Sequence, residues 1–271
     1  MVRHRHVRLD LFSSKEAAEY LRGNDMAILP VGCFEMHGSR MPLATDAMED
    51  WAMGLLLAEQ WKCVCFPPIF YIYPGASAPW PGTIAISPEI STEYVKAVAL
   101  SAVKGGFKRL VLCACHGPMR FMAQTIIRSI HQETSHVVVH LNPYAKVQEA
   151  FRQEFGFEGE DVMVLGALHV LDLDGAFDPT VSVEKPLEFP FPEIGGLKER
   201  GVEVPWIFSR DYQHTGLNPR LKPEDAERAA QVLHRVAGEY GQVPALFSSY
   251  QEKMKRLFEE KPWDSPGAWS E

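Results

Sequence analysis

Two short apolar runs, each followed by a polar loop and a helix-like segment, constrain the fold of this chain most strongly. The runs cover Met26–Val31 and Arg109–Cys115, and both are short enough to be buried strands. Segments with helical spacing of apolar residues follow them, at 46–61 and 119–131. Strands that alternate with helices indicate a mostly parallel sheet covered by helices on both faces. We therefore predict an α/β fold, built as a single domain over residues 1–271.

The rest of the chain continues this alternation. Further apolar, strand-like runs occur at 63–70, 137–141 and 162–168. Further helices are expected at 14–21, 88–103, 143–155, 222–241 and 243–258. The core is expected over about 10–260, with a Pro-rich excursion or lid at 180–205 and a loose tail from 262.

Charge and hydropathy exclude several classes of protein. The net charge of -8 argues against nucleic acid as a partner, because phosphate binding needs a basic face. No run approaches the length of a membrane-spanning helix, so no membrane partner is expected. The basic start, Met1–His6, has no apolar signal core behind it, which predicts a cytoplasmic protein. A frayed polar end is the simpler interpretation of this segment, although His4 and His6 could bind stray metal.

The cysteines point to a reducing compartment. There are five of them, an odd number, and four lie in apolar, strand-like runs. We expect buried free thiols. The two C-x-C pairs alternate across a strand, which disfavours a zinc site made from them.

Polar residues with metal-binding chemistry follow three of the predicted strands. Glu35, His37 and Asp46 follow the first, and His116 follows the run 109–115. The run 162–168 ends at His169, with Asp172 and Asp174 after it. The carboxyl ends of parallel strands share one edge of the sheet, so these residues are expected to meet there. Carboxylates and imidazoles suit zinc or manganese, and five such ligands suffice for two ions bridged by a carboxylate.

Each of these residues also has a plainer interpretation. His37 and His116 could be loop histidines that are hydrogen-bonded to the backbone. Asp46 could be the N-cap of the helix that follows it. Glu35 could be exposed, and Asp172 and Asp174 could be turn residues before Gly175.

Taken together, the motifs resemble the creatininase (creatinine amidohydrolase) family. The segment Glu35-x-His37-Gly38-x-x-x-Pro42-Leu43-x-Thr45-Asp46 is similar to the family's signature loop. Three further family elements follow in order: Pro81-Gly82-Thr83, then Cys115-His116-Gly117, then His169 with Asp172 and Asp174. The resemblance spreads over roughly residues 25–240.

The resemblance implies a metal-dependent hydrolase with two divalent ions per chain, zinc or manganese, with iron as an alternative. By position, the metal ligands would be Glu35, His37, Asp46, His116 and Asp172. Asp46 would bridge the ions, and His169 would act as the catalytic proton donor. The family's usual assembly implies a homo-oligomer, often a hexamer, that acts on a small polar substrate.

The chain departs from the family pattern around this ligand set. Arg40 stands where many members have His, and Asp172 stands where Glu is more usual. The family's Asn-Gly-His-Gly-Gly-Asn is Ala114-Cys115-His116-Gly117-Pro118-Met119 here, and its Glu-Thr-Ser is Asp174-Gly175-Ala176. The surroundings of the metal site and the substrate wall are therefore expected to differ, which argues against creatinine itself as the substrate.

Three residues are candidates for substrate binding. Arg40 could hold a carboxylate or phosphate, or could be a surface charge or part of an internal ion pair. Trp80 could stack on a flat ring or pack in the core. His214 lies in a late polar loop that could approach the site.

The leading functional prediction is hydrolysis of a C–N bond in a small cyclic amide by water activated on two metals. Alternatives are hydrolysis of a C–C bond in a small cyclic ketone, and a peptide-processing or lyase member of the same family. A catalytically silent metal-binding oligomer is a third class.

Overall fold

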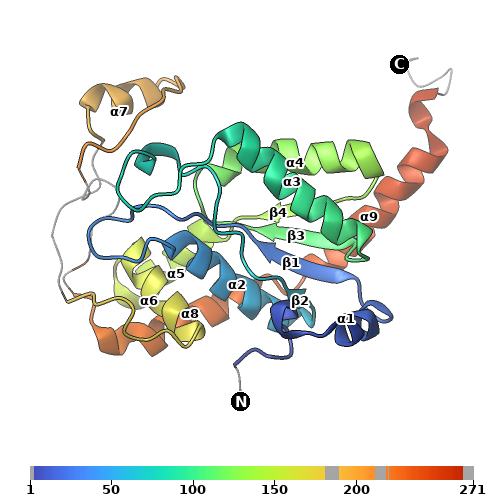
Figure 1. The fold of residues 1–271 in the computed structure, drawn as a ribbon, viewed down its shortest axis with the longest axis horizontal. Helices are drawn as coiled ribbons and strands as arrows, with labels where there is room; N and C mark the ends of the chain where they lie inside the picture. The colour runs from blue at the N-terminus through green and yellow to red at the C-terminus, as the bar shows by residue number, and fades with distance from the viewer. Residues whose placement is uncertain (1–2, 181–188, 211–217, 219, 265–271) are drawn as a thin grey trace.

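A four-stranded parallel sheet lies between two layers of helices in the computed structural model, which describes residues 3–180, 189–210, 218 and 220–264 (Figure 1). The strands in sheet order are β2 (Val64–Cys65), β1 (Met26–Pro30), β3 (Arg109–Cys113) and β4 (Val139–Leu141). Every neighbouring pair is parallel. The α/β fold class predicted from the alternating pattern is confirmed.

Helices connect the strands and complete the two layers. Their bounds are α1 Ser14–Leu21, α2 Thr45–Trp61, α3 Pro88–Lys104, α4 Met119–Thr134, α5 Tyr144–Phe155, α6 Glu160–Val170, α7 Pro192–Lys198, α8 Ala226–Glu239 and α9 Val243–Glu260. The helices expected from apolar spacing are all present, with ends that shift by a few residues.

Side chains of the central strand alternate between two apolar cores. Met26 and Ile28 of β1 belong to the core beneath α2, α6 and α8. Ala27 and Leu29 belong to the core beneath α3 and α4. A strand buried on both faces has no polar position, which explains the continuous apolar run in the sequence.

Local capping signals set the starts of two helices as expected. Before α1, the Ser13 hydroxyl accepts from the Glu16 N–H, while the Glu16 carboxylate accepts from the Ser13 N–H. Before α3, the Ser87 hydroxyl accepts from the Ile90 N–H, and Pro88 occupies the first turn.

The run 162–168 is a helix, so the prediction of a strand there is wrong. It forms the interior of α6, which packs chiefly against α8 and α2 and is buried on nearly all sides. Periodicity cannot separate a helix that is apolar all round from a buried strand. The acidic pair Glu160–Asp161, which begins this helix, was the overlooked signal of a helix start.

Three further predictions concern the rest of the chain. All five cysteines are buried free thiols, as expected. The Pro-rich stretch contains α7, and residues 181–188 within it lie outside the described residues. The expected loose tail begins with a short 3₁₀ turn at Pro262–Asp264, and the residues after 264 are likewise not described. Across the described part of the chain, none of the helices combines the length and apolarity that a membrane span requires.

The contact between α6 and α8 depends on a glycine. A Cβ on Gly166 would lie 2.8 Å from the backbone carbon of Ala229, whereas a Cβ on Gly238 of α8 would meet nothing within 4 Å. We expect Gly166→Ala to lower the free energy of unfolding by roughly 1–3 kcal/mol through overpacking. The matched change Gly238→Ala should raise it by up to about 1 kcal/mol. Denaturant unfolding midpoints would test both; equal effects would contradict the close packing of α6 on α8.

Candidate metal centre

The loop between β1 and α2 returns on itself at the carboxyl edge of the sheet. The Glu35 N–H donates to the Leu43 carbonyl at 2.8 Å, which closes the loop. At its start, a Cβ on Gly32 would lie 2.3 Å from the Cα of Ala47, so only glycine lets the first turn of α2 come this close. This approach brings Asp46, in that first turn, to the end of β1.

A second loop holds the first one in place. The Met36 N–H donates to the Thr83 hydroxyl at 3.0 Å, and the Ile84 N–H donates to the Phe34 carbonyl at 3.0 Å. Gly82, just before Thr83, has a φ of 85°, and a Cβ on it would lie 2.6 Å from Cδ1 of Leu43. The Pro-Gly-Thr element of the sequence is therefore the brace of the signature loop.

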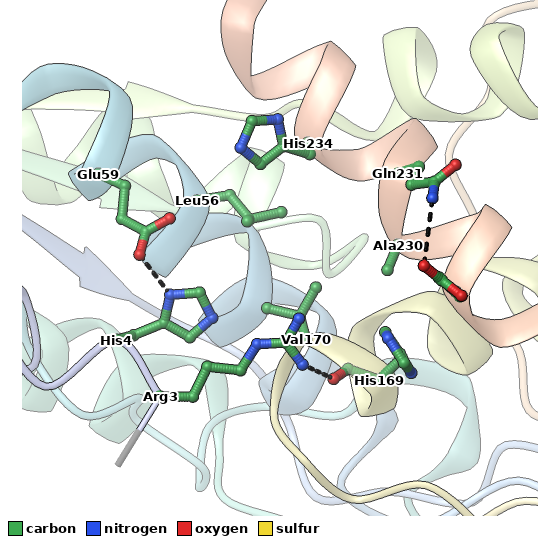
Figure 2. Close-up of a pocket in the computed structure, with 10 residues that line it drawn as sticks. Arg3, His4, Leu56, Glu59, His169, Val170, Ala230, Gln231 and His234 are labelled. Carbon is green, nitrogen blue, oxygen red and sulfur yellow. Dashed lines mark hydrogen bonds and ion pairs between the residues drawn. The ribbon is translucent and has the colours of Figure 1, made fainter. Parts of the chain in front are cut away.

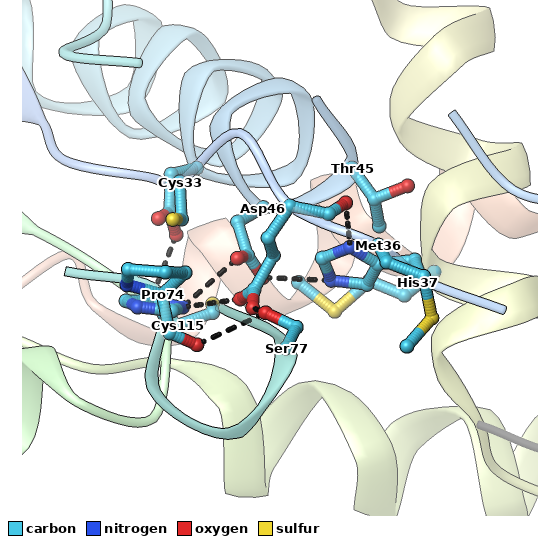
Figure 3. A network of polar contacts seen from close by, with 12 residues as sticks. Cys33, Met36, His37, Thr45, Asp46, Pro74, Ser77 and Cys115 are labelled. Carbon is cyan, nitrogen blue, oxygen red and sulfur yellow. Dashed lines mark hydrogen bonds and ion pairs between the residues drawn. The ribbon is translucent and has the colours of Figure 1, made fainter. Parts of the chain in front are cut away.

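Four buried ligand groups converge where the loops meet. Ligand atoms of Cys33, Glu35, Asp46 and His116 all lie within 4.8 Å of one another. Asp46 is at the centre, and its Oδ1 lies 3.2 Å from Nε2 of His37 (Figure 3). Its Oδ2 lies 2.9 Å from Nδ1 of His116. Nδ1 of His116 also lies 3.2 Å from Oε1 of Glu35. These buried carboxylates and imidazoles are the donor types that a divalent metal ion prefers.

Backbone carbonyls orient both imidazoles toward Asp46. Nε2 of His116 lies 2.8 Å from the Tyr73 carbonyl, and Nδ1 of His37 lies 3.1 Å from the Glu35 carbonyl. A carbonyl oxygen accepts, so each of these nitrogens carries the proton when the ring is neutral. The opposite nitrogen of each ring is left to bind a metal, as in many histidine metal sites.

Neighbouring groups complete the wall around Glu35. The Ser77 hydroxyl, from the short turn Gly75–Ser77, donates to Oε2 of Glu35. The Cys33 thiol donates to the Ile72 carbonyl at 3.6 Å. Burial, with the nearby charges of Glu35 and Asp46, raises the pKa of Cys33, so this sulfur is a neutral thiol in the metal-free protein.

The site holds more buried carboxyl groups than its imidazoles can balance. Glu49 and Asp50, one turn further along α2, are buried, and Oε1 of Glu49 and Oδ2 of Asp50 have no hydrogen-bond partner. Burial and the neighbouring carboxylates raise the pKa of both groups well above its usual value. The other oxygen of Asp50 accepts from the Cys115 N–H at 2.7 Å. Buried carboxyl groups with an unpaired oxygen are costly to ionise unless a cation compensates them. These residues therefore fit a divalent cation.

The same electrostatics act on the central groups. Burial disfavours the charged form of His37, but the carboxylates of Asp46, Glu160 and Glu35 outweigh it and raise its pKa to about 10. Burial likewise opposes ionisation of Asp46, yet the two imidazoles hold its pKa well below its usual value. Asp46 is thus the group of the cluster that stays ionised most firmly.

Glu160 is a site residue that the sequence reasoning missed. It begins α6 and lines the same cavity as Glu35, Asp46 and His116. Burial and the surrounding carboxylates raise its pKa to about 7, against the opposing effect of His37. A strand over 162–168 would place the residues that follow it at the site, whereas the helix places its first residue, Glu160, there.

His169 and Asp172 lie away from the cluster, which corrects their predicted placement. His169 is the penultimate residue of α6, and Asp172 follows the helix. At this far end, Nδ1 of His169 lies 2.9 Å from Oδ1 of Asp174, and the Arg3 guanidinium lies 3.1 Å from Asp172. The helix has 11 residues, which separates its two ends by about 15 Å. Asp172 is also largely exposed and has a positive φ of 58°, as expected of a turn residue.

The predicted substrate residues are placed less centrally. Arg40 is exposed. The pKa of Asp178 is lowered chiefly by hydrogen bonds from Thr180, and the nearby charge of Arg40 lowers it further. The Trp80 Nε1–H donates to the Phe208 carbonyl at 2.9 Å, so this indole braces a neighbouring segment. His214 lies outside the described residues.

Asp46 is not an N-cap, because the cap position of α2 is Ala44.

The cluster opens into a cavity of about 930 Å³. Its walls include His140 of β4, Asn142 and Tyr144 just after that strand, and Trp206 and Phe208 from the segment after α7. Polar groups on one side and aromatic rings on the other suit a small polar ring compound. The fold and this site together define an α/β protein with a buried carboxylate–histidine metal centre.

Comparison with known proteins identifies the family. The family model described as creatininase, creatinine amidohydrolase, matches residues 10–169, which is more than half of the chain. The chain belongs to the creatininase family.

Relatives and solved structures are consistent with this assignment. The 3-dehydro-scyllo-inosose hydrolase of Thermotoga maritima is 27% identical over 149 residues, which are 54% of this chain and 48% of that protein. The match thus spans about half of the curated relative. A Trp-to-Phe mutant creatininase has a TM-score of 0.69 at 21% identity, over 88% of this chain and 98% of its own. A putative creatinine amidohydrolase from Bacteroides fragilis has a TM-score of 0.66 at 19% identity, over 88% and 96%. These likenesses show the fold.

We expect Glu160→Gln to lower the bound divalent metal by at least one equivalent per chain, because it replaces a carboxylate that lines the cavity beside the cluster. The matched change Asp172→Asn should keep the metal content of the parent, because Asp172 lies at the other end of α6. Elemental analysis after dialysis would measure both. Metal loss in Asp172→Asn alone would restore the ligand assignment made from the sequence.

Proposed function

We propose that this protein is a metal-dependent hydrolase that cleaves a C–N bond in a small cyclic amide. The observation that carries the proposal is Asp46, buried between His37 and His116 and open to a large polar and aromatic cavity. Structural neighbours were solved as a manganese form of creatininase and a zinc–zinc form of a creatininase mutant. Zinc or manganese is therefore the proposed cofactor, with two ions per chain.

The ligand set divides naturally around Asp46. Glu35 and His116 would hold one ion on one side of it, and His37 and Glu160 would hold a second ion on the other. A bound divalent ion lowers the pKa of its water toward neutral and polarises a carbonyl group. Five ligands of this kind match the count that was predicted, with Glu160 in the place of Asp172.

The remaining residues of the site position the ligands and control protons. Ser77 and the Tyr73 carbonyl hold Glu35 and His116 in one orientation. His140 lines the cavity, and its Nε2 has no hydrogen-bond partner. Burial lowers the pKa of His140, so its ring is neutral at pH 7 and can accept a proton at Nε2 and pass it to the leaving nitrogen. This assigns to His140 the proton transfer that the sequence had suggested for His169.

A second candidate reaction is hydrolysis of a C–C bond in a small cyclic ketone. The observation that favours it is the similarity to the hydrolase of Thermotoga maritima, whose name gives an inosose as its substrate. Both reactions begin with the attack of water on a carbonyl carbon, so the same ligand set serves either. The two reactions differ only in their substrate.

The homo-oligomer and the cytoplasmic location remain predictions.

Metal dependence is the first test of the function. The protein, stripped with a chelator, should turn over neither cyclic amides nor cyclic polyol ketones, and activity should return with Zn²⁺ or Mn²⁺. His116→Ala should lower turnover by about 10³-fold or more, because a lost ligand removes several kcal/mol of transition-state stabilisation. The matched change His136→Ala, far from the cluster, should leave turnover unchanged.

Release of an amine from the amide panel would support C–N hydrolysis, and turnover of the ketones alone would support the second candidate. Activity that survives chelation would contradict both. Cleavage of a peptide in the absence of small-molecule turnover would favour the peptide-processing alternative.

The role of His140 has a separate readout. His140→Gln keeps a similar shape but cannot titrate, so turnover should fall by roughly 10²–10⁴-fold, the usual share of a proton-transferring group. Metal content should stay at the parent level, and the pH dependence of turnover should lose its acid limb. An unchanged pH profile would show that His140 only lines the cavity.

A further inference from the structure

A second cavity, which the proposed function does not use, lies at the far end of α6. It measures about 390 Å³ and lies between the N-terminal segment, α2, α6 and α8 (Figure 2). Three histidines, His4, His169 and His234, line it, so we call it the histidine cavity. These residues come from three distant parts of the sequence, and only the fold brings them together.

A carboxylate holds one ring nitrogen of His4, as in many metal-binding histidines. Its Nδ1 lies 2.7 Å from Oε1 of Glu59, and its side chain is only 8% exposed. Its Nε2 is buried and has no hydrogen-bond partner. When a carboxylate accepts the Nδ1 proton, the lone pair of a neutral imidazole lies on Nε2, the atom that would bind an ion. The backbone of His4 is also held at a φ of 57°, a conformation that few residues other than glycine adopt.

The other two imidazoles are available for the same purpose. Nδ1 of His169 lies 2.9 Å from Oδ1 of Asp174, which repeats the carboxylate–imidazole pairing and leaves Nε2 for a ligand. His234 is exposed on α8 and makes no hydrogen bond or ion pair within the described ranges. Two of the three rings are thus oriented by a carboxylate, and the third is free to turn.

The charges around the cavity favour a cation over an anion. Glu59 and Glu227 line the wall, and Asp174 stands behind His169. Among the described residues that line the cavity, the guanidinium belongs to Arg3, which is already bound to the His169 carbonyl at 2.8 Å and to Asp172 at 3.1 Å. Carboxylates therefore exceed unpaired positive charge, which disfavours a phosphate or carboxylate ligand.

We propose that the histidine cavity binds one divalent transition-metal ion of the kind that prefers imidazole, such as Zn²⁺, Ni²⁺ or Cu²⁺. His4 and His169 are the ligands that a carboxylate orients, and His234 turns to complete the site. The turn is required because, among the described residues, no three ligand atoms in this cavity lie as close together as those of the first cluster. The His234 ring lies at the surface, where a change of rotamer is inexpensive. The bound ion ties the N-terminal segment to α6 and α8.

This site does not depend on the proposed function. About 14 Å of helix separates Glu160, at the first cluster, from His169 in the histidine cavity. The two sites also differ in kind, because the first is dominated by buried carboxylates and the second by imidazoles. Loss of either one should therefore leave the other able to bind.

Metal counting on the full-length chain tests the inference. The parent and its variants are dialysed against micromolar Zn²⁺, and the bound zinc is measured by elemental analysis. His4→Ala and His234→Ala should each lose about one equivalent, whereas the surface control His136→Ala should lose none. His234 is exposed, so its removal cannot act through misfolding. Unchanged zinc in both His4→Ala and His234→Ala would overturn the proposal.

Two further measurements separate this site from the first one. Asp46→Asn, or His37→Gln if that variant fails to fold, should still bind one equivalent that His4→Ala then removes. That result would hold even if the hydrolase proposal failed. With Cu²⁺ as the probe in the Asp46→Asn protein, electron paramagnetic resonance should show nitrogen splitting that diminishes in His234→Ala. Copper bound through oxygen ligands alone, with no nitrogen splitting, would mark an adventitious ion and contradict the assignment.

Discussion

The pairing of one buried carboxylate with two imidazoles is the interaction on which the site depends. Asp46 lies between His37 and His116. His37 and Asp46 belong to one loop, whereas His116 comes from a distant part of the sequence. The close approach of α2 to Gly32 brings the carboxylate to the sheet edge. The first turn of a helix also favours a negative charge, because the free N–H groups there carry partial positive charge.

The acids around this pair make the site a place where binding and stability are linked. Glu35, Glu49, Asp50 and Glu160 surround Asp46, and burial raises the pKa of each of these four neighbours. A protein that buries so many carboxylates stores electrostatic repulsion, which protons relieve in the absence of a cation. A divalent ion relieves the same repulsion and binds only the folded arrangement, so it should stabilise the fold as it fills the site.

Helix α6 connects the two proposed metal sites. Its first residue, Glu160, faces the carboxylate cluster, and its penultimate residue, His169, faces the histidine cavity. The helix is buried along its length between α2 and α8, so both ends are held rigidly. One element thus presents a carboxylate to one proposed metal site and an imidazole to the other.

The sequence by itself determined the fold class, the order of the elements and most of the central ligand set. Buried strands, helical spacing and caps are local signals, and the loop from Glu35 to Asp46 carries three ligands within one short segment. Only the tertiary structure decided which later residues join them. A short, wholly apolar run has no period that distinguishes helix from strand, so packing against α8 decided that 162–168 is a helix. A parallel strand over 162–168 would have ended at the edge of the sheet that carries the site. The helix instead begins there, so Glu160 lies at the cluster, and His169 and Asp172 lie at the opposite end.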